Sequence, residues 1–380
     1  MLLLANAIKE IPGFYIAMNV VGLAVVLPCL GTFTASLQRS ATGLSLILLF
    51  FALSMSMLAA YYLNPSMDVW LQAKALAATV VWASIFIVVF VVVRRTEDAN
   101  RVAMWIDGVC LIISTSVWAG ALLHLAGIPF GEVIEQGAAF RAFGPLGDQV
   151  GFVVVLPALT SLVARRPLRF GFHLSAVLLT GTRGALLCLV VGVIGLFVLR
   201  AGTNRGRWRQ MAAVVIVGIL LWFMPMSAAL RERFLDPSMR QLSMGAGIAV
   251  VRNSPVIGVG FNGLDANRSA AVEDWTMPVQ AANGLSRASN QYIQTAVDGG
   301  LVALSALLLF VALSIRNTRR VLRWPAASPA LLGSQLWLIS VFLGNQASLW
   351  LLSGTACGFF VFAVAGLAAK AGDLSQREQL

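Results

Sequence analysis

The stretch FGFHLSAVLLTGTRGALLCLVVGVIGLFVL, residues 170–199, decides how this chain folds. It contains one formally charged side chain, Arg183, near the middle of 30 residues. Arginine clusters lie on both sides of it, at 165–169 and at 200–209. A single helix would place these clusters on opposite sides of a membrane. Two short helices that turn at Thr182-Arg183-Gly184 place both clusters on one side, and we favour them because basic residues gather in cytoplasmic loops.

The composition of the whole chain predicts a membrane protein. Of its 380 residues, 59% are hydrophobic and 11% are charged, whereas about a quarter are charged in a soluble domain. The mean hydropathy is +0.84. These values exclude an ordinary soluble enzyme, a disordered chain and a secreted disulfide scaffold. The net charge of +11 does not predict nucleic-acid binding, because the basic residues are scattered between apolar runs. The four cysteines lie far apart and there are two histidines, so a zinc site is not expected. The sequence also has no phosphate-binding glycine loop and no acidic metal cluster, so no cofactor is expected.

Runs without charged residues predict eleven membrane spans in an all-α, polytopic membrane protein. The runs are 11–38, 40–67, 75–93, 108–131, 149–164, 170–182, 184–199, 210–230, 299–315 and 324–369. The last run is long enough for two spans, with a break near Gly344–Ser348, because one span needs roughly 20 residues. We expect a single membrane domain over residues 1–380.

Basic residues orient these spans. With the C-terminus in the cytoplasm, 17 lysines and arginines lie inside and 10 lie outside, which fits the cytoplasmic excess of basic residues. The N-terminus is then outside. Thirteen residues of helix, 170–182, span about 20 Å, so we expect Arg183 to turn within the depth of the membrane, in a cavity. Two long outside segments follow from this topology, 124–148 and a large periplasmic loop at 229–287. Within that loop, helical spacing places Leu242, Ile248 and Val251 on the apolar side of residues 239–252, and this helix lies either on the membrane surface or against the protein.

Four motifs in this order resemble the bacterial O-antigen ligase and polymerase superfamily. They are the glycine-rich RAFGPLGDQVGF (141–152), TGTRGALL (180–187), Arg240 followed by SPVIGVGFNGL (254–264), and SNQYIQTAVDGGLVAL (289–304). The resemblance covers about residues 136–370. It implies a helical protein of the bacterial inner membrane with its active side in the periplasm. It also implies metal-independent transfer of a glycan from undecaprenyl pyrophosphate to a glycan or lipid acceptor, in the assembly of cell-surface polysaccharides such as lipopolysaccharide.

The chemistry of a pyrophosphate leaving group requires positive charge, and converging arginines supply it when no metal is used. By the motif match, Arg183 and Arg240 are the catalytic candidates that bind pyrophosphate. The further candidates for substrate binding are Arg141, Arg252, Arg287, Ser289 and Asn290. We interpret His124 and His173 as core or interface residues, and Asp298 as a residue that either supports the helix start near Asn290 or faces the cavity.

Ser289 stands where the ligases have a histidine that is thought to activate the acceptor, and a hydroxyl is a poor base near neutral pH. This departure favours a polymerase over a ligase. A carboxylate then becomes the candidate base, and the choices are Glu132, Glu135, Asp148, Glu273 and Asp274. A transporter of lipid-linked glycans and a non-catalytic assembly subunit are alternatives, but the two halves show no repeat of the kind that transporters have.

Overall fold

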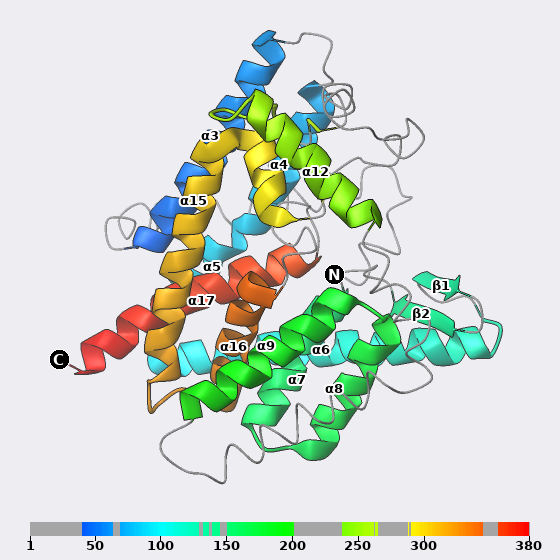
Figure 1. Cartoon of the computed structure of the whole chain (residues 1–380). Coiled ribbons are helices and arrows are strands. Elements are labelled where there is room, and N and C mark those ends of the chain that lie inside the picture. The colour runs from blue at the N-terminus through cyan, green and yellow to red at the C-terminus, as the bar shows by residue number, and fades with distance from the viewer. Residues whose placement is uncertain are drawn as a thin grey trace. The chain divides into compact units, whose positions relative to one another are not determined.

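The computed structural model describes residues 40–63, 69–128, 132–136, 139–144, 150–200, 238–261, 263–264, 288, 290–344 and 356–379. In these residues the chain is helical, with one pair of short strands (Figure 1). The elements are α3 (Ala41–Leu63), α4 (Val69–Ala83), α5 (Ile85–Val92), α6 (Thr96–Leu125), β1 (Glu132–Gln136), β2 (Ala139–Gly144), α7 (Val150–Val163), α8 (Pro167–Thr180), α9 (Arg183–Arg200), α12 (Ser238–Asn253), α15 (Gln291–Leu322), α16 (Pro329–Gly344) and α17 (Ala356–Gln379).

Four described helices, α3, α6, α15 and most of α17, are long and apolar enough to cross a membrane, and α7, α9 and α16 are among the shorter apolar helices. The prediction of a helical membrane protein is therefore confirmed. The total of eleven spans stays a prediction, because the runs 11–38 and 210–230 lie outside the described residues. Each of the other nine predicted spans corresponds to helix, and α16 ends at Gly344, where the break in the last run was expected.

Helix α6 begins at Thr96, twelve residues before the predicted span at 108. The charge-free criterion misplaced this start because charged residues suit the first turn of a helix. Glu97 and Asp98 lie in that turn, and the Arg95 backbone N–H donates to the Asp98 carboxylate at 3.0 Å. The charged first turns and the apolar span that follows thus form one continuous helix.

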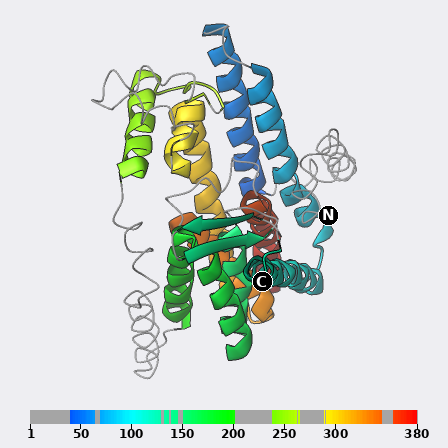
Figure 2. The same cartoon turned by 90° about the vertical axis from the view of Figure 1, so that its right-hand side faces the viewer.

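Strands β1 and β2 correct the all-α expectation in one place. They pair antiparallel with Ile134 opposite Arg141, and Figure 2 shows them side by side. The sheet packs against α6 and α8, and Ala142 in β2 is fully buried. The segment was predicted only as a long outside loop, although it carries the β-branched and aromatic residues that favour strands.

The chain forms two compact units, each of which is described separately. In the first, residues 95–237 and 318–345 with part of the N-terminal region, α7 is the central helix and contacts α6, α8, α9 and α16 (Figure 1). Every residue of α7 is buried except Leu162. The Trp337 indole N–H of α16 donates to the Phe152 carbonyl at 2.6 Å, which fixes α16 along α7.

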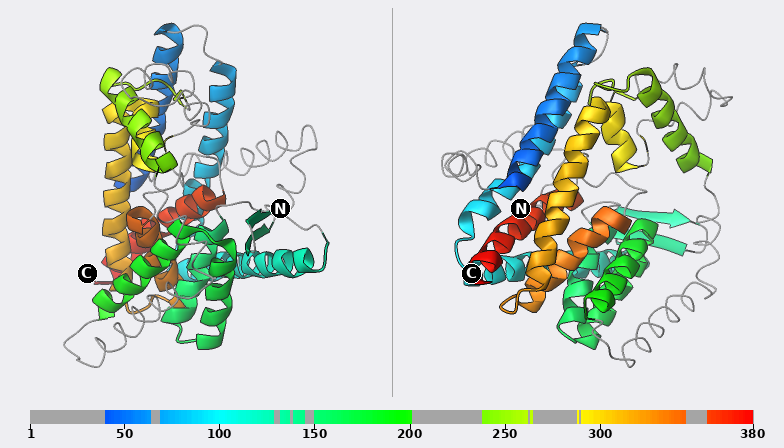
Figure 3. Two further views of the ribbon diagram at one scale, coloured as in Figure 1. Left: turned by 45° about the vertical axis from the view of Figure 1, so that its right-hand side comes forward. Right: turned by 60° about the vertical axis from the view of Figure 1, so that its left-hand side comes forward.

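The second unit holds α3, α4, α5, α12, α17 and α15 up to Asn317. Helix α17 lies along α5 and α4, and a methyl group added at Gly366 would meet the backbone of Phe86 at 2.6 Å. Helix α15 is interrupted inside, because Gly299 and Gly300 have non-helical backbone angles. Figure 3 shows its short first segment lying beside the long second segment, so the chain turns back at the two glycines.

Candidate functional site

The turn that carries Arg183 joins two separate helices. Helix α8 ends at Thr180, Gly181 adopts the left-handed conformation with φ 57°, and α9 begins at Arg183. The Thr182 carbonyl accepts hydrogen bonds from the Ala185 and Leu186 backbone N–H groups, which starts the new helix. The prediction of two short helices is confirmed, and the single helix with a central arginine is wrong. The turn lies one residue earlier than predicted, because Arg183 is already helical.

The start of α7 packs against this turn. A methyl group added at Gly151 would lie 2.7 Å from Thr180 Oγ1 and 2.9 Å from Thr182 Cβ, so only glycine allows the observed approach. Gly151 ends the glycine-rich motif at 141–152, and Thr180 and Thr182 belong to the Thr-Arg-Gly-Ala motif. The structure thus brings the first two sequence motifs into contact.

Arg183 is the first residue of α9, and the N–H groups at the very start of a helix have no acceptor in a preceding helical turn. A helix N-terminus therefore favours a bound anion. Arg141 lies in β2, opposite Ile134 of β1, and the strand that carries it packs against α6 and α8. Both arginines belong to the first unit.

The other two motifs meet in the second unit through backbone contacts. The Val259 N–H donates to the Val297 carbonyl at 2.8 Å, and the Gly260 N–H donates to the Asp298 carbonyl at 3.1 Å. The Leu301 N–H donates to the Pro255 carbonyl at 2.8 Å across the break in α15. The Pro-x-x-Gly-x-Gly loop thus docks on the point where α15 turns back.

Glycine is required on both sides of this contact. Gly258 has φ 68°, and an added methyl group would lie 2.5 Å from the Val297 carbonyl oxygen. Gly300 has φ 65°, and its methyl group would lie 2.1 Å from the Val256 carbonyl oxygen. Positive φ favours glycine, and here the neighbouring backbone also leaves no room for a side chain. Ser56 of α3 bridges the loop and α15. Its hydroxyl donates to the Asp298 carbonyl at 2.6 Å and also contacts the Ile257 carbonyl.

Asn290 caps α15. Its side-chain oxygen accepts hydrogen bonds from the Tyr292 N–H at 2.9 Å and the Ile293 N–H at 3.1 Å. This is the usual arrangement of an asparagine at a helix N-cap. Asp298 lies at the end of the first segment of α15 rather than at its start, and its side chain is 1% exposed. Asp298 Oδ1 accepts a hydrogen bond from Gln294 Nε2 at 2.7 Å, so the expectation that this residue caps the first turn of α15 is wrong.

Helix α12 carries two further predicted site residues, Arg240 in its first turn and Arg252 in its last. Its buried residues, Ala246, Ala249 and Val250, form a cluster with Val297 of α15 and other apolar residues. Packing against the protein is therefore confirmed for this helix. Of the predicted apolar side, Val251 packs against this cluster, whereas Ile248 is 43% exposed. Arg287 and Ser289 lie outside the described residues, as do the proposed bases Asp148, Glu273 and Asp274. Glu132 and Glu135 lie in β1.

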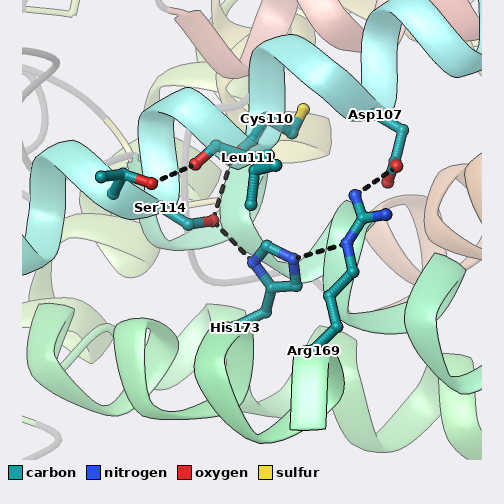
Figure 4. A network of polar contacts seen from close by, with 7 residues as sticks. Asp107, Cys110, Leu111, Ser114, Arg169 and His173 are labelled. Atoms are coloured by element: carbon teal, nitrogen blue, oxygen red, sulfur yellow. Dashed lines mark hydrogen bonds and ion pairs between the residues drawn. The ribbon is translucent and has the colours of Figure 1, made fainter. Parts of the chain in front are cut away.

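A buried polar network between α6 and α8 was not predicted (Figure 4). Arg169 Nη2 lies 2.5 Å from Asp107 Oδ2, and Arg169 Nε donates to His173 Nε2 at 3.4 Å. His173 Nδ1 lies 2.9 Å from the Ser114 hydroxyl, and the histidine is fully buried. The interpretation of His173 as a core residue is confirmed. Sequence spacing offered a signal, since Arg169 and His173 are four residues apart and Asp107 and Ser114 are seven apart, which places each pair on one helix face.

These features define a helical membrane protein in which glycine turns hold the start of α9 and the break in α15 in place. Comparison with known proteins bears on the family. Residues 170–308 match the family model of the O-antigen ligases, and this match supports the resemblance to the O-antigen ligase and polymerase superfamily. The matched segment contains three of the four motifs and begins after the glycine-rich one at 141–152. No curated protein matches the chain.

Proposed function

We propose that this protein joins oligosaccharides carried on undecaprenyl pyrophosphate, on the periplasmic side of the bacterial inner membrane, as a polysaccharide polymerase. The observation that carries the proposal is the placement of Arg183. This arginine lies inside the family match, at the first residue of α9, in a turn that Gly151 holds against α7. A helix N-terminus with an arginine is suited to binding a pyrophosphate group.

The reaction needs two events at one anomeric carbon. The bond from that carbon to the pyrophosphate oxygen breaks, and the pyrophosphate takes the electron pair. An acceptor hydroxyl forms the new glycosidic bond and gives its proton to a base. Arg183 stabilises the charge that develops on the leaving group, and Arg240 and Arg141 are further candidates for this role. An arginine in this role supplies positive charge of the kind that a metal ion supplies in other enzymes.

Contacts at the two ends of α7 support the proposed orientation of the protein in the membrane. Near the end of α7, Thr160 contacts Gly333 of α16, since a methyl group at Gly333 would lie 2.4 Å from Thr160 Oγ1. Just before α16, the Ala326 carbonyl accepts a hydrogen bond from Asn100 of α6 at 3.0 Å. The arginine-bearing segments 95–101, 164–166 and 319–323 are attached to this end of α7. Gly151 and the Arg183 turn contact the opposite end, about 20 Å away along the helix. This separation is what an arginine-rich cytoplasmic side and a periplasmic Arg183 require.

The ligase alternative keeps one specific observation in its favour, because the matching family model is that of the O-antigen ligases. Polymerase and ligase differ in the acceptor. A polymerase extends a lipid-linked chain, whereas a ligase transfers the chain to a lipid A core. We favour the polymerase because Ser289 stands where the ligases carry the histidine that is thought to activate the acceptor.

The experiment uses purified full-length protein in lipid with a synthetic undecaprenyl-pyrophosphate repeat unit, with and without a lipid A core acceptor. Arg183→Ala abolishes product, and Arg183→Lys lowers turnover strongly, because lysine keeps the charge but loses the bidentate guanidinium. Arg101→Ala is the matched control, since Arg101 is an exposed arginine of the same unit on α6. Full-length product from Arg183→Ala would refute the role of Arg183. Product only with the core acceptor would establish the ligase.

A further inference from the structure

The end of the large loop is attached to α15 by a buried side chain. Gln294 Oε1 accepts a hydrogen bond from the Ala288 backbone N–H at 2.6 Å. The amide nitrogen of the same side chain donates to Asp298 Oδ1 at 2.7 Å. Gln294 and Asp298 are four residues apart and therefore lie on one face of the helix. These hydrogen bonds therefore connect Ala288, at the end of the loop, through Gln294 to Asp298, where α15 breaks.

Asp298 is at the same time the backbone anchor of the Gly258–Gly260 loop. Its carbonyl accepts hydrogen bonds from the Gly260 N–H at 3.1 Å and from the Ser56 hydroxyl at 2.6 Å. One residue thus touches the Pro-x-x-Gly-x-Gly loop through its backbone and the loop end through Gln294. Gln294 and Asp298 together thus bind both Gly260 and Ala288.

The amide of Gln294 makes both side-chain contacts because it offers a donor and an acceptor. Position 294 must accept from an N–H and donate to a carboxylate, and a glutamate cannot donate when it is ionised. Gln294 is 2% exposed, Asp298 is 1% exposed and Ala288 is fully buried. Removal of the amide therefore leaves the Ala288 N–H and the Asp298 carboxylate each without this partner in a buried place, which is unfavourable.

We propose that Gln294 and Asp298 are positioning residues that fix the backbone at Ala288, just before the helix cap Asn290, against the Gly258–Gly260 loop. The inference rests on the proposed function for its catalytic consequence. Arg287 and Ser289 are the covalent neighbours of Ala288, and both are candidate substrate contacts. An ordered backbone at this point reduces the entropy that is lost when the acceptor and the lipid-linked donor are brought together. Asp298 acts here through its acceptor oxygen and not as a base.

The test has a readout that does not depend on catalysis. A nitroxide label is attached to Ser289→Cys in an otherwise cysteine-free chain, and its mobility is measured by electron paramagnetic resonance in lipid. Gln294→Leu and Gln294→Glu increase the mobility of the label, and Asp298→Asn leaves it as in the parent, because an asparagine oxygen still accepts from Gln294. The matched control is Thr295→Val, which removes a buried hydroxyl from the same helix turn. That hydroxyl bonds to the Gln291 carbonyl and not to Ala288.

Activity is measured in the same variants with Ser289 unchanged. Gln294→Leu and Gln294→Glu lower turnover about tenfold or more, and Asp298→Asn stays within about threefold of the parent. Equal label mobility in the parent and both Gln294 variants overturns the inference. Loss of activity in Asp298→Asn as severe as in Asp298→Ala also overturns it, since the charge rather than the hydrogen bond would then be required. A parent that makes no product would refute the proposed function, while the mobility measurement would still decide the positioning role.

Discussion

Replacing Gly258 by alanine tests the docking of the Pro-x-x-Gly-x-Gly loop on α15. The added methyl group would lie 2.5 Å from the Val297 carbonyl oxygen, 2.6 Å from Gly300 N and 2.8 Å from Gly299 N. All three neighbours are backbone atoms, so no side chain can move aside. The φ of 68° is a second obstacle, because an alanine is disfavoured in the left-handed region.

The magnitude follows from two losses. Left-handed backbone costs an alanine about 1–2 kcal/mol relative to glycine. The Val297 carbonyl is also the acceptor for Val259 N–H at 2.8 Å, and displacing it loses a hydrogen bond worth about 1 kcal/mol. The sum is about 2–3 kcal/mol, which shifts the equilibrium between docked and undocked loop by roughly 30- to 150-fold.

The assay is the rate at which a maleimide labels a single cysteine at position 249. Ala249 is 2% exposed and belongs to the same apolar cluster as Leu264 and Val259, so labelling requires this part of the chain to open. When opening and closing are fast, the labelling rate follows the open population, and Gly258→Ala raises it by the same factor. Gly171→Ala is the control, because nothing lies within 4 Å of its added methyl group. A labelling rate in Gly258→Ala equal to that of the control would refute the reasoning.

Three further predictions concern topology, the base and the buried ion pair. Single cysteines in the loop 229–287 are labelled by a membrane-impermeant reagent from the periplasm, and those in Arg316–Arg323 only after the membrane is opened; the reverse pattern would contradict the proposed orientation. Ser289→Ala keeps most of the product yield, because a neutral hydroxyl is a poor base, and complete loss at normal expression would show that Ser289 has a larger role. Asp107→Asn lowers stability by about 1.5–3 kcal/mol, because Arg169, 27% exposed in its side chain, loses a charged partner. The thermal midpoint in detergent measures this loss, and an unchanged midpoint in Asp107→Asn would show that the pair contributes nothing.

Apolar runs predicted most of the helices because a membrane span must be long, uncharged and internally hydrogen-bonded. The same rule misplaced the start of α6, since Thr96–Asp107 is helical and charged. It also gave no sign that α15 turns back at Gly299 and Gly300, which lie at the edge of the predicted span 299–315. A pair of glycines in an apolar run is compatible with an unbroken helix, and the break depends on a loop some forty residues earlier in the chain.

The motifs marked the turn before Arg183 and the break in α15, but they did not separate residues with a structural role from candidates for chemistry. Asn290 was expected to bind substrate, and its side-chain oxygen caps α15. Gln294 was not singled out at all, although it holds the loop end at Ala288. Its role depends on a contact between residues that the sequence pattern does not pair.

The motifs divide into two kinds of residue once their contacts are known. Gly151, Gly258 and Gly300 lie where another part of the chain approaches too closely for a side chain. Arg183 lies next to one such contact, at the start of a helix whose position the contact fixes. Glycine variants should therefore change the geometry of the turns. Their loss of activity should follow from that change. Arg183 variants should keep the geometry and lose the chemistry, because the turn is built from the backbone of its neighbours.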